Sequence, residues 1–486
     1  MIEDKNIDDA PLVKALEEYQ AGEKISMHMP GHKGGKGFPN WLGERLACFD
    51  VTEIPGLDNF HDPDDVILES MNACAKAFGA EKSFFLVNGS TSGIHAMLLS
   101  SFRKGDKILV ARNCHMSVIN GMILFGLHPV FVTPQFSDSW QWVMPVELPA
   151  WEKAIGENPD IEGVIVTSPD YMGFCTPVAK LARLLHASGK LLLVDEAHGA
   201  HFAFSRKLPE TALEQGADLC VQSLHKTMPA LTQSAVLHIG SPQVDANRVQ
   251  RAVSMLTTTS PSYAVMASID YARYIFEKEG EEKYEKLLIL LSEMKQELSR
   301  MKNFRLIPDK TGNISRDPTR MVIDTSQSDI TGHELYRRIK DKYGIVPEMA
   351  DDCHVVFIVT PSDTEKELDS LKRCFIELDN QSKHSDAVTS CLSLFEMEHS
   401  TTSDIPDFWD KCVELPLDET EGYVSAGMVT PYPPGIPVIC PGETINRKQI
   451  KYLQQVILAG QTIQGLMKSN GSAGDKIRVV QKKNPE

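Results

Sequence analysis

A lysine and an aspartate, Lys226 and Asp195, stand 31 positions apart in settings that point to chemistry. Lys226 lies in the segment Ser223–Pro229, where the hydroxyl of Ser223 and the imidazole of His225 flank its amine. Such an amine can hold an aldehyde cofactor as a Schiff base while its neighbours bind a phosphate. Asp195 ends an apolar run, where its carboxylate can sit under the nitrogen of a pyridine ring. Together they favour a site for pyridoxal phosphate (PLP).

Each of these residues also has a plainer interpretation. A lone lysine is usually a surface charge, His225 alone could be a packed polar residue, and Asp195 could cap a helix. The run Lys190–Val194 before Asp195 is continuously apolar, as a buried parallel strand should be. An acid at the carboxyl end of such a strand lies where α/β sheets bind ligands. A carboxylate there would keep the ring nitrogen protonated, so that the ring acts as an electron sink.

A turn of small residues, Asn88–Gly93, follows an apolar run and precedes a helical pattern. The backbone N–H groups and hydroxyls of Ser90, Thr91 and Ser92 would converge there on an anion, aided by the helix dipole. The motif alone is only moderately specific, because serine and threonine are ordinary helix caps. Beside Lys226 it is interpreted as a phosphate cup.

Two histidines follow the predicted strands. His115 comes just after the strand predicted at 107–110, at the level where it can stack on a cofactor ring, although isolated histidines are more often structural. His198 follows Asp195 by three positions and could reach the cofactor's phenolic oxygen. His201 has no such argument and is expected to pack in the core.

Hydroxyls cluster again at Thr257–Tyr263, just before a long helical pattern. One interpretation is helix capping by Ser260 with Pro261 at the first helical position. The other is a further phosphate contact from Thr258 and Ser260.

Short apolar strands alternate with helical patterns from about residue 66, which predicts an α/β fold with a mostly parallel sheet. A helical stretch at 264–303, broken near Gly280, links this part to a smaller α/β pattern with strands at 320–324 and 355–359. Residues 379–404 are polar and are predicted to be a linker or domain edge. The expected divisions are an N-terminal arm and substrate loop at 1–65, a large cofactor domain at 66–275, a small α/β domain at 276–378 and a C-terminal domain at 379–486.

Composition narrows the possible partners. The 486 residues carry a formal net charge of -17, which argues against nucleic acid and anionic membranes as partners. Ten cysteines are scattered singly, without a CxxC pair, so no metal site is expected and a reducing cytoplasm is. The N-terminus is unlike a signal peptide, and no apolar run approaches the ~18 residues that span a bilayer.

Several motifs carry a resemblance to a known family. The chain resembles the Orn/Lys/Arg decarboxylase family of aspartate-aminotransferase fold (PLP fold type I), in its short bacterial form without a receiver-like domain before the PLP domain. The matching segments are Pro30–Lys33, Asn88–Ser92, Arg112–His115, Asp195–His201, Ser223–Lys226, Thr258–Pro261 and Pro431–Gly435.

The resemblance implies roles for these residues. Lys226 carries PLP, Asp195 pairs with its ring nitrogen and His115 stacks on the ring. The phosphate contacts are Ser90, Thr91, Ser223 and His225. The Thr258–Pro261 segment reaches the phosphate of a neighbouring subunit, so a homodimer or an oligomer of dimers is expected.

The predicted reaction is decarboxylation of a basic L-amino acid in polyamine metabolism. Aminotransferases typically clamp the substrate carboxylate with an arginine, and the strand expected to supply it, His354–Thr360, has none. An unclamped carboxylate in an apolar niche favours loss of carbon dioxide. Glu348, Asp58 and Asp62 are candidates for the substrate's distal cation, and each could equally be a solvated or capping carboxylate. Arginine is the first choice of substrate, then lysine, then ornithine.

Two other functions stay open. An aminotransferase or α-oxoamine synthase on the same fold fits Asp195–His198, because related synthases carry a similar tetrapeptide. A non-catalytic regulator is disfavoured because it should have lost its Schiff-base lysine, and Lys226 is present.

Overall fold

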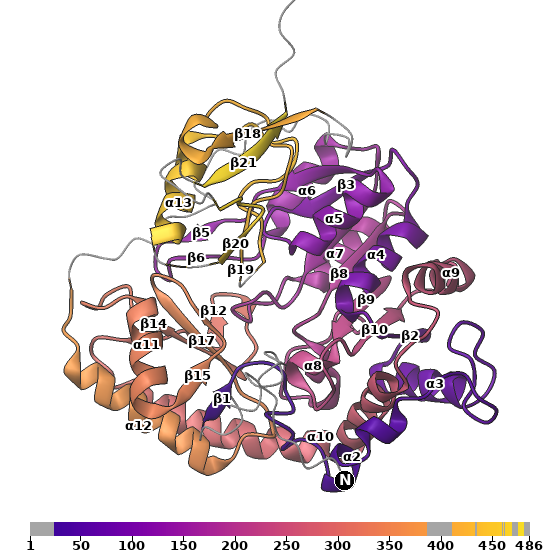
Figure 1. Cartoon of the computed structure of the whole chain (residues 1–486), viewed down its shortest axis with the longest axis horizontal. Coiled ribbons are helices and arrows are strands. Elements are labelled where there is room, and N and C mark those ends of the chain that lie inside the picture. The colour runs from indigo at the N-terminus through magenta and orange to yellow at the C-terminus, as the bar shows by residue number, and fades with distance from the viewer. Residues whose placement is uncertain are drawn as a thin grey trace, which may run out of the picture.

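The computed structural model describes residues 24–385, 411–432, 435–458, 460, 462–468 and 475–480. Its centre is a seven-stranded sheet (Figure 1). In order across the sheet, the strands are β2 (Lys82–Leu86), β10 (Ala235–Ile239), β9 (Leu219–Ser223), β8 (Leu191–Asp195), β7 (Ile161–Thr167), β3 (Lys107–Ala111) and β4 (His128–Val132). β10 is antiparallel to both neighbours, and the other adjacent pairs are parallel. The predicted, mostly parallel α/β sheet is confirmed.

Helices cover this sheet because its strands are apolar on both faces. Leu192, Leu193 and Val194 of β8, for example, are completely buried. The helices of this part are α3 (Val66–Phe78), α4 (Gly89–Ser101), α5 (Met116–Phe125), α6 (Leu148–Glu157), α7 (Val178–His186) and α9 (Ala246–Leu256). α3 and α5 both end at a glycine in the left-handed conformation, Gly79 and Gly126, which is a common helix stop.

The long helix α10 (Tyr263–Leu298) differs from its prediction in two ways. It is not broken near Gly280: the helix runs through this glycine, which lets Phe204 approach so closely that a Cβ would lie 2.8 Å from the Phe204 Cβ. Its cap is also not Ser260. The Ser262 side chain accepts the Val265 N–H at 3.3 Å, so the cap lies two positions after Ser260.

A four-stranded sheet follows α10. Its order is β11 (Arg305–Leu306), β14 (Arg320–Asp324), β17 (His354–Ile358) and β16 (Met349–Ala350), with the helices α11 (Gly332–Tyr343) and α12 (Glu365–Gln381). β1 (Ile25–Met27) pairs in parallel with β15 (Ile345–Pro347) in this region. Because of this pairing, the residues after β1 lie between the two sheets. The predicted linker at 379–404 begins inside α12, and its residues from 386 onward lie outside the described residues.

The C-terminal part has its own small apolar cluster, built on Val429, Ile439, Ile450 and Val479. Its elements are β18 (Cys412–Pro416), η3 (Leu417–Glu419), β19 (Thr430–Tyr432), α13 (Arg447–Leu458), β20 (Thr462–Gln464) and β21 (Lys476–Val480). In Figure 1 it lies beside α6 and the hairpin β5 (Phe136–Ser137) and β6 (Trp142–Val143). The remaining short elements are α2 (Asn40–Gly43), η1 (Leu46–Phe49), η2 (Ala200–Phe204), α8 (Leu224–Thr227), β12 (Lys310–Thr311) and β13 (Ile314–Ser315).

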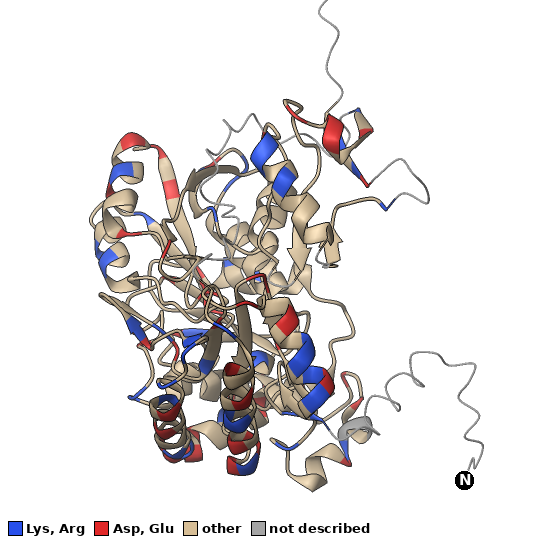
Figure 2. Ribbon diagram, turned by 90° about the vertical axis from the view of Figure 1, so that its left-hand side faces the viewer, with Lys and Arg blue, Asp and Glu red and all other residues tan. Residues whose placement is uncertain are grey.

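Charged residues of both signs occur along the outer helices (Figure 2). In the part of the chain that the structure describes, every helix is too short or too polar to cross a membrane.

Candidate active site

Lys226 sits on a one-turn helix at the end of β9. β9 ends at Ser223 and α8 follows directly. α8 stops after one turn because Met228 precedes Pro229, and a residue before proline is pushed into the extended conformation that Met228 has. Lys226 is therefore held at the carboxyl edge of the large sheet.

Asp195 ends β8, the strand next to β9, and pairs in register with Val221. Its side chain is only 3% exposed. Burial raises the pKa of Asp195, and the positive charge of Lys226 opposes this rise. Burial likewise lowers the pKa of Lys226 to about 8, with Asp195 opposing and Arg320 reinforcing the shift. The structure thus brings together the two residues that the sequence paired.

His198 lies between the amine of Lys226 and a guanidinium. Its Nε2 is 3.0 Å from Lys226 Nζ, and its Nδ1 is 3.1 Å from Arg320 Nη2. The ring of Tyr171 meets the His198 ring edge-on, with centroids 5.1 Å apart. Burial, followed by the charges of Lys226 and Arg320, holds the pKa of His198 well below its ordinary value. His198 is therefore a neutral imidazole that contacts the predicted reactive amine.

Arg320 is a residue that sequence reasoning missed, and the expectation of a site without arginine is wrong. β17 has no arginine, but its neighbour β14 begins with Arg320, opposite Ile358. The Arg320 side chain is 1% exposed and reaches His198. The sequence signal was a charged residue at the first position of the strand predicted at 320–324.

His115 caps α5 with its own ring. Its Nδ1 is 2.8 Å from Ser117 Oγ and accepts the Ser117 N–H at 3.2 Å. Gly435, from the C-terminal part, has a φ of +86°, and a Cβ there would come within 2.9 Å of the His115 ring. Burial, and then the charge of Lys226, lowers the pKa of His115 to about 4. The ring is therefore neutral and held in place, as a stacking role requires.

The predicted phosphate cup forms the first turn of α4. The helix begins at Gly89, whose φ is +74° and whose N–H donates to the Gln233 carbonyl at 2.9 Å. Ser92 Oγ donates to the Gly89 carbonyl at 2.8 Å, while Ser90 is partly exposed and Thr91 exposed. The N–H groups of a first helical turn have no partner within the helix, so this turn can receive an anion.

Two buried hydroxyls flank Lys226 without a partner. Ser223 Oγ and Thr227 Oγ1 make no hydrogen bond within the described residues. His225 differs from its prediction: its Nδ1 lies 3.0 Å from the Ser234 carbonyl and donates to it, so a neutral ring leaves Nε2 as an acceptor. Burial lowers the pKa of His225 to about 4. Donation from Nε2 to a phosphate would require a protonated ring.

The N-terminal segment packs directly against α8. Gly31 N–H donates to the His225 carbonyl at 2.7 Å, and a Cβ on Gly31 would lie 2.8 Å from the backbone of Thr227. Lys33 is buried and donates to the Ile358 carbonyl at 2.6 Å, so its charge anchors this segment to β17. The Pro30–Lys33 motif therefore forms a wall beside Lys226.

Glu348 is the predicted substrate carboxylate that the structure places in this cluster. It accepts the Met29 N–H at 2.9 Å through Oε2 and the Tyr171 hydroxyl through Oε1. Its negative charge opposes the lowering of the Lys226 pKa. Glu348 is thus a positioned acid on the side of the site formed by β1 and β15.

Asp58 has a structural task in this chain. Its carboxylate accepts the backbone N–H groups of Asp64, Asp65 and Ile67 at 2.9–3.1 Å, which fixes the loop before α3. Burial acts to raise the pKa of Asp58, but the backbone hydrogen bonds together outweigh it and lower this pKa. The capping interpretation of Asp58 is the one that matches this geometry.

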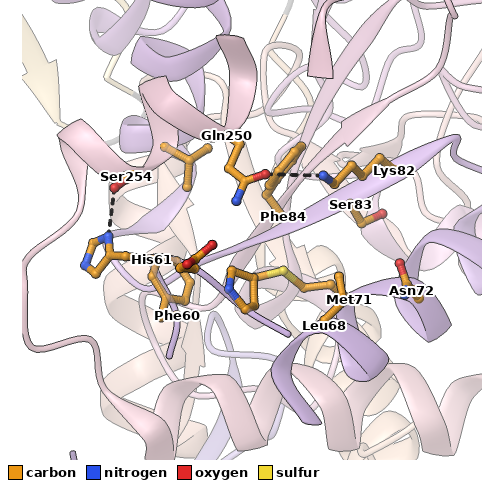
Figure 3. Close-up of a pocket in the computed structure, with 13 residues that line it drawn as sticks. Phe60, His61, Leu68, Met71, Asn72, Lys82, Ser83, Phe84, Gln250 and Ser254 are labelled. Atoms are coloured by element: carbon orange, nitrogen blue, oxygen red, sulfur yellow. Dashed lines mark hydrogen bonds between the residues drawn. The ribbon is translucent and has the colours of Figure 1, made fainter. Parts of the chain in front are cut away.

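Asp62 lines a different cavity, of about 270 Å³, between the loop, α3, β2 and α9 (Figure 3). Lys226 is not among its lining residues. His61 closes one side, with its Nδ1 2.9 Å from Ser254 Oγ and its Nε2 3.0 Å from the Thr258 carbonyl.

Thr258 and Ser260 are exposed on the loop between α9 and α10. Their hydroxyl oxygens are 3.2 Å apart. Within the described residues, their hydrogen bonds lie inside this loop and to His61, so the chain by itself does not bring them to Lys226.

Comparisons with known proteins agree with this geometry. Residues 10–314 match the family model "Orn/Lys/Arg decarboxylase, major domain", and residues 389–471 match "Orn/Lys/Arg decarboxylase, C-terminal domain". The arginine decarboxylase of Bacillus subtilis is 32% identical over 467 residues, covering 94% of this chain and 95% of that protein. Constitutive lysine decarboxylase of Escherichia coli superposes with a TM-score of 0.77 at 18% identity, covering 98% of this chain and 82% of that one. An alanine–glyoxylate aminotransferase from Nostoc sp. superposes with a TM-score of 0.56 at 13% identity, covering 74% and 95%.

The large sheet, with a lysine and an aspartate at the carboxyl ends of adjacent strands, defines an α/β protein of aspartate-aminotransferase fold, the fold type I class. Within that class, the chain belongs to the Orn/Lys/Arg decarboxylase family. The resemblance stated from the motifs is confirmed.

Proposed function

We propose that this chain is a PLP-dependent carboxy-lyase of basic L-amino acids that converts arginine to agmatine, with lysine and then ornithine as poorer substrates. The family supports the reaction, and the relatives named arginine decarboxylase support arginine as the first substrate. The observation that carries the proposal is the amine of Lys226, held beside Asp195 and His198 at the sheet's carboxyl edge.

The donors around Lys226 fit PLP. Ser223 Oγ is fully buried without a partner, and a buried hydroxyl in that state indicates a missing ligand. The first turn of α4 offers N–H groups, with Ser90, Thr91 and Ser92, to a phosphate dianion. When bound, PLP supplies an aldehyde for an amine and a pyridine ring that withdraws electrons from the bond that breaks.

Residues of this chain would orient the pyridine ring and keep its nitrogen protonated. Asp195, buried and close to Lys226, is the carboxylate that would hold a proton on the ring nitrogen. His115, backed by Gly435, would lie against the ring face. Lys226 would anchor the aldehyde, because its lowered pKa leaves more of the amine uncharged.

Charges of opposite sign suit the two ends of a basic amino acid. Arg320 brings a guanidinium whose Nε and Nη1 have no hydrogen-bond partner within the described residues, which suits the α-carboxylate. Glu348, fixed by Tyr171 and Met29, suits the distal cation. A carboxylate can accept two N–H groups of a guanidinium at once, which favours arginine over lysine.

An aminotransferase is the second candidate, and Arg320 is the observation that favours it. The absence of an arginine was the sequence argument for a lyase, and this argument no longer holds. The two reactions differ in product, since a transaminase releases a keto acid and a lyase releases carbon dioxide.

The test is to incubate the purified chain and PLP with arginine, lysine and ornithine and to identify the products. Carbon dioxide with agmatine, fastest from arginine, supports the proposal; keto acid without carbon dioxide rejects it. Glu348→Gln should raise the KM for arginine about 100-fold, because it removes a charge partner worth roughly 2–3 kcal/mol. Glu365→Gln, at the exposed start of α12, is the matched control and should leave the KM unchanged.

The exposed loop with Thr258 and Ser260 supports a dimer as the working assembly. We propose that these hydroxyls complete the phosphate site of a second copy. A double substitution of Thr258 and Ser260 to alanine should weaken PLP binding in a protein whose mass in solution is that of a dimer, and a fully active monomer would reject this assignment.

A further inference from the structure

His198 lies between the Arg320 guanidinium and the Lys226 amine, which differ in whether they can accept a hydrogen bond. Arg320 Nη2 lies 3.1 Å from Nδ1, and Lys226 Nζ lies 3.0 Å from Nε2. His198 is 6% exposed and Arg320 1%, so water does not compete for these positions. The partners at the two ring nitrogens, Arg320 at Nδ1 and Lys226 at Nε2, therefore determine which nitrogen of His198 carries the proton.

A guanidinium has N–H donors and no acceptor. His198 Nδ1 must then accept from Arg320, and a neutral imidazole that accepts at Nδ1 carries its proton on Nε2. Burial and the two neighbouring positive charges keep the ring neutral by lowering the pKa of His198. The Nε2–H then donates to Lys226 Nζ, which accepts whenever its amine is uncharged.

Asp317, an acid whose carboxylate interacts electrostatically with Arg320, faces other groups. Asp317 Oδ1 accepts the Thr319 N–H at 2.9 Å and hydroxyl at 2.7 Å, while its Oδ2 is 3.2 Å from His201 Nε2. Within the described residues, the bond to His198 is the side-chain hydrogen bond that Arg320 makes. Gly173 packs against the Arg320 side chain, with a would-be Cβ 3.0 Å from the arginine Cβ, and limits its movement.

We propose that Arg320 is a positioning residue that holds His198 in the Nε2–H tautomer, so that His198 presents a proton donor to the amine of Lys226. The proposal rests on the proposed function for its kinetic consequence, but the tautomer itself is a property of the protein without cofactor. Decarboxylation replaces the carboxylate by a proton at the same carbon, so the reaction consumes one proton. Arg320 keeps a protonated nitrogen facing the place where the reacting amine is held.

The direct test is nitrogen NMR on the cofactor-free protein with ¹⁵N-labelled histidine at about pH 9.5, where most of the Lys226 amine is uncharged and can accept from Nε2. The protonated and bare nitrogens of a neutral imidazole resonate far apart, and the His198→Gln spectrum identifies the signals of His198. We expect Nε2–H in the wild type and in Arg320→Lys, and at least half Nδ1–H in Arg320→Met. An unchanged Nε2–H signal in Arg320→Met would overturn the proposal.

Arg316→Met is the matched control. Arg316 is also buried, and it donates to the Met172 carbonyl at 2.8 Å and to the Arg320 carbonyl rather than to His198. Its loss should lower the melting temperature, as loss of a buried guanidinium does, and leave the His198 tautomer as it was. A tautomer change of equal size in both variants would mean that general loosening, not the Arg320 contact, sets the proton position.

A double-mutant cycle measures the kinetic consequence. A glutamine amide donates to Lys226 whatever stands at position 320, so His198→Gln removes the need for tautomer control. Loss of the α-carboxylate contact proposed for Arg320 should raise KM in both backgrounds, so kcat is compared at saturating substrate. We expect Arg320→Met to lower kcat about 10- to 100-fold beside His198 and less than threefold in the His198→Gln background, and Arg320→Lys to restore most of kcat beside His198. Equal losses in both backgrounds would refute the positioning role.

Failure of the proposed function would be visible separately. If the wild type releases no carbon dioxide from arginine, lysine or ornithine, that function is rejected, while the NMR spectra still decide the tautomer.

Discussion

Arg112 and Glu443 form a buried ion pair that joins the segment carrying His115 to the C-terminal part of the chain. Arg112 Nε lies 2.9 Å from one carboxylate oxygen of Glu443, and Nη2 lies 3.0 Å from the other. The same guanidinium donates to the Pro437 carbonyl at 2.7 Å. Arg112 directly follows β3, so this contact joins the end of that strand to the C-terminal part. The turn that holds Gly435 against His115 is fixed by this pair.

Glu443→Gln should destabilise the protein by about 3–5 kcal/mol, because it leaves a buried guanidinium without its counter-charge. Urea unfolding measures this change. Glu414→Gln is the control, since Glu414 and Arg478 form an exposed pair 4.0 Å apart that should contribute less than about 1 kcal/mol. Similar decreases in the free energy of unfolding in the two variants would show that the buried Arg112–Glu443 pair stabilises the protein no more than the exposed pair does.

Gly435→Ala should weaken PLP binding about tenfold, because its new Cβ would displace the His115 ring. Gly422→Ala is the matched control: its φ of +76° imposes a similar backbone strain of roughly 1 kcal/mol, but no atom lies within 4 Å of the new methyl group. Absorbance titration with PLP and thermal melting separate the two effects. The idea fails if both variants bind PLP as the wild type does.

Lys226→Ala should abolish both the yellow absorbance of the PLP-loaded protein and its activity, because no other amine takes its place beside His198 among the described residues. A melting temperature close to that of the wild type would show that the fold survives. Retained absorbance with full turnover would refute the assignment of the site.

Asp195→Asn should still bind PLP but lose activity by about 100-fold or more, because an amide does not hold a proton on the ring nitrogen as a carboxylate does. The measurements are the PLP dissociation constant and kcat. A near-wild-type kcat would show that the ring proton is held elsewhere.

Uptake of PLP by the cofactor-free protein should depend on pH through Lys226. Its pKa is lowered to about 8, so the reactive, uncharged amine is about a tenth of the total at pH 7 and dominates above pH 8. The uptake rate should therefore rise about tenfold per unit up to pH 8 and then level off, as followed by stopped-flow absorbance. Arg320→Met should move the midpoint upward, since Arg320 lowers this pKa. A wild-type rate still rising steeply at pH 9.5 would contradict the lowered pKa.

Predictions of strand bounds were correct where the local pattern of apolar residues and turns is enough to specify the structure. The strand at 320–324 has the predicted bounds, because a short apolar run between turns specifies a buried strand. The predicted break of the helix near Gly280 was wrong because tertiary packing, rather than local propensity, decides the structure there. Glycine lowers helix propensity, but packing against Phe204 holds the helix together through this position.

The sequence by itself determined the fold class, the family and the pairing of Lys226 with Asp195, because these follow from short motifs and from strand ends that meet at one sheet edge. Only the tertiary structure decided that Arg320 reaches His198, that Gly435 backs His115 and that Asp58 caps α3. Such contacts join residues that can be more than a hundred positions apart, as Arg320 and His198 are. Their geometry depends on how separate sheets pack, which no local pattern encodes.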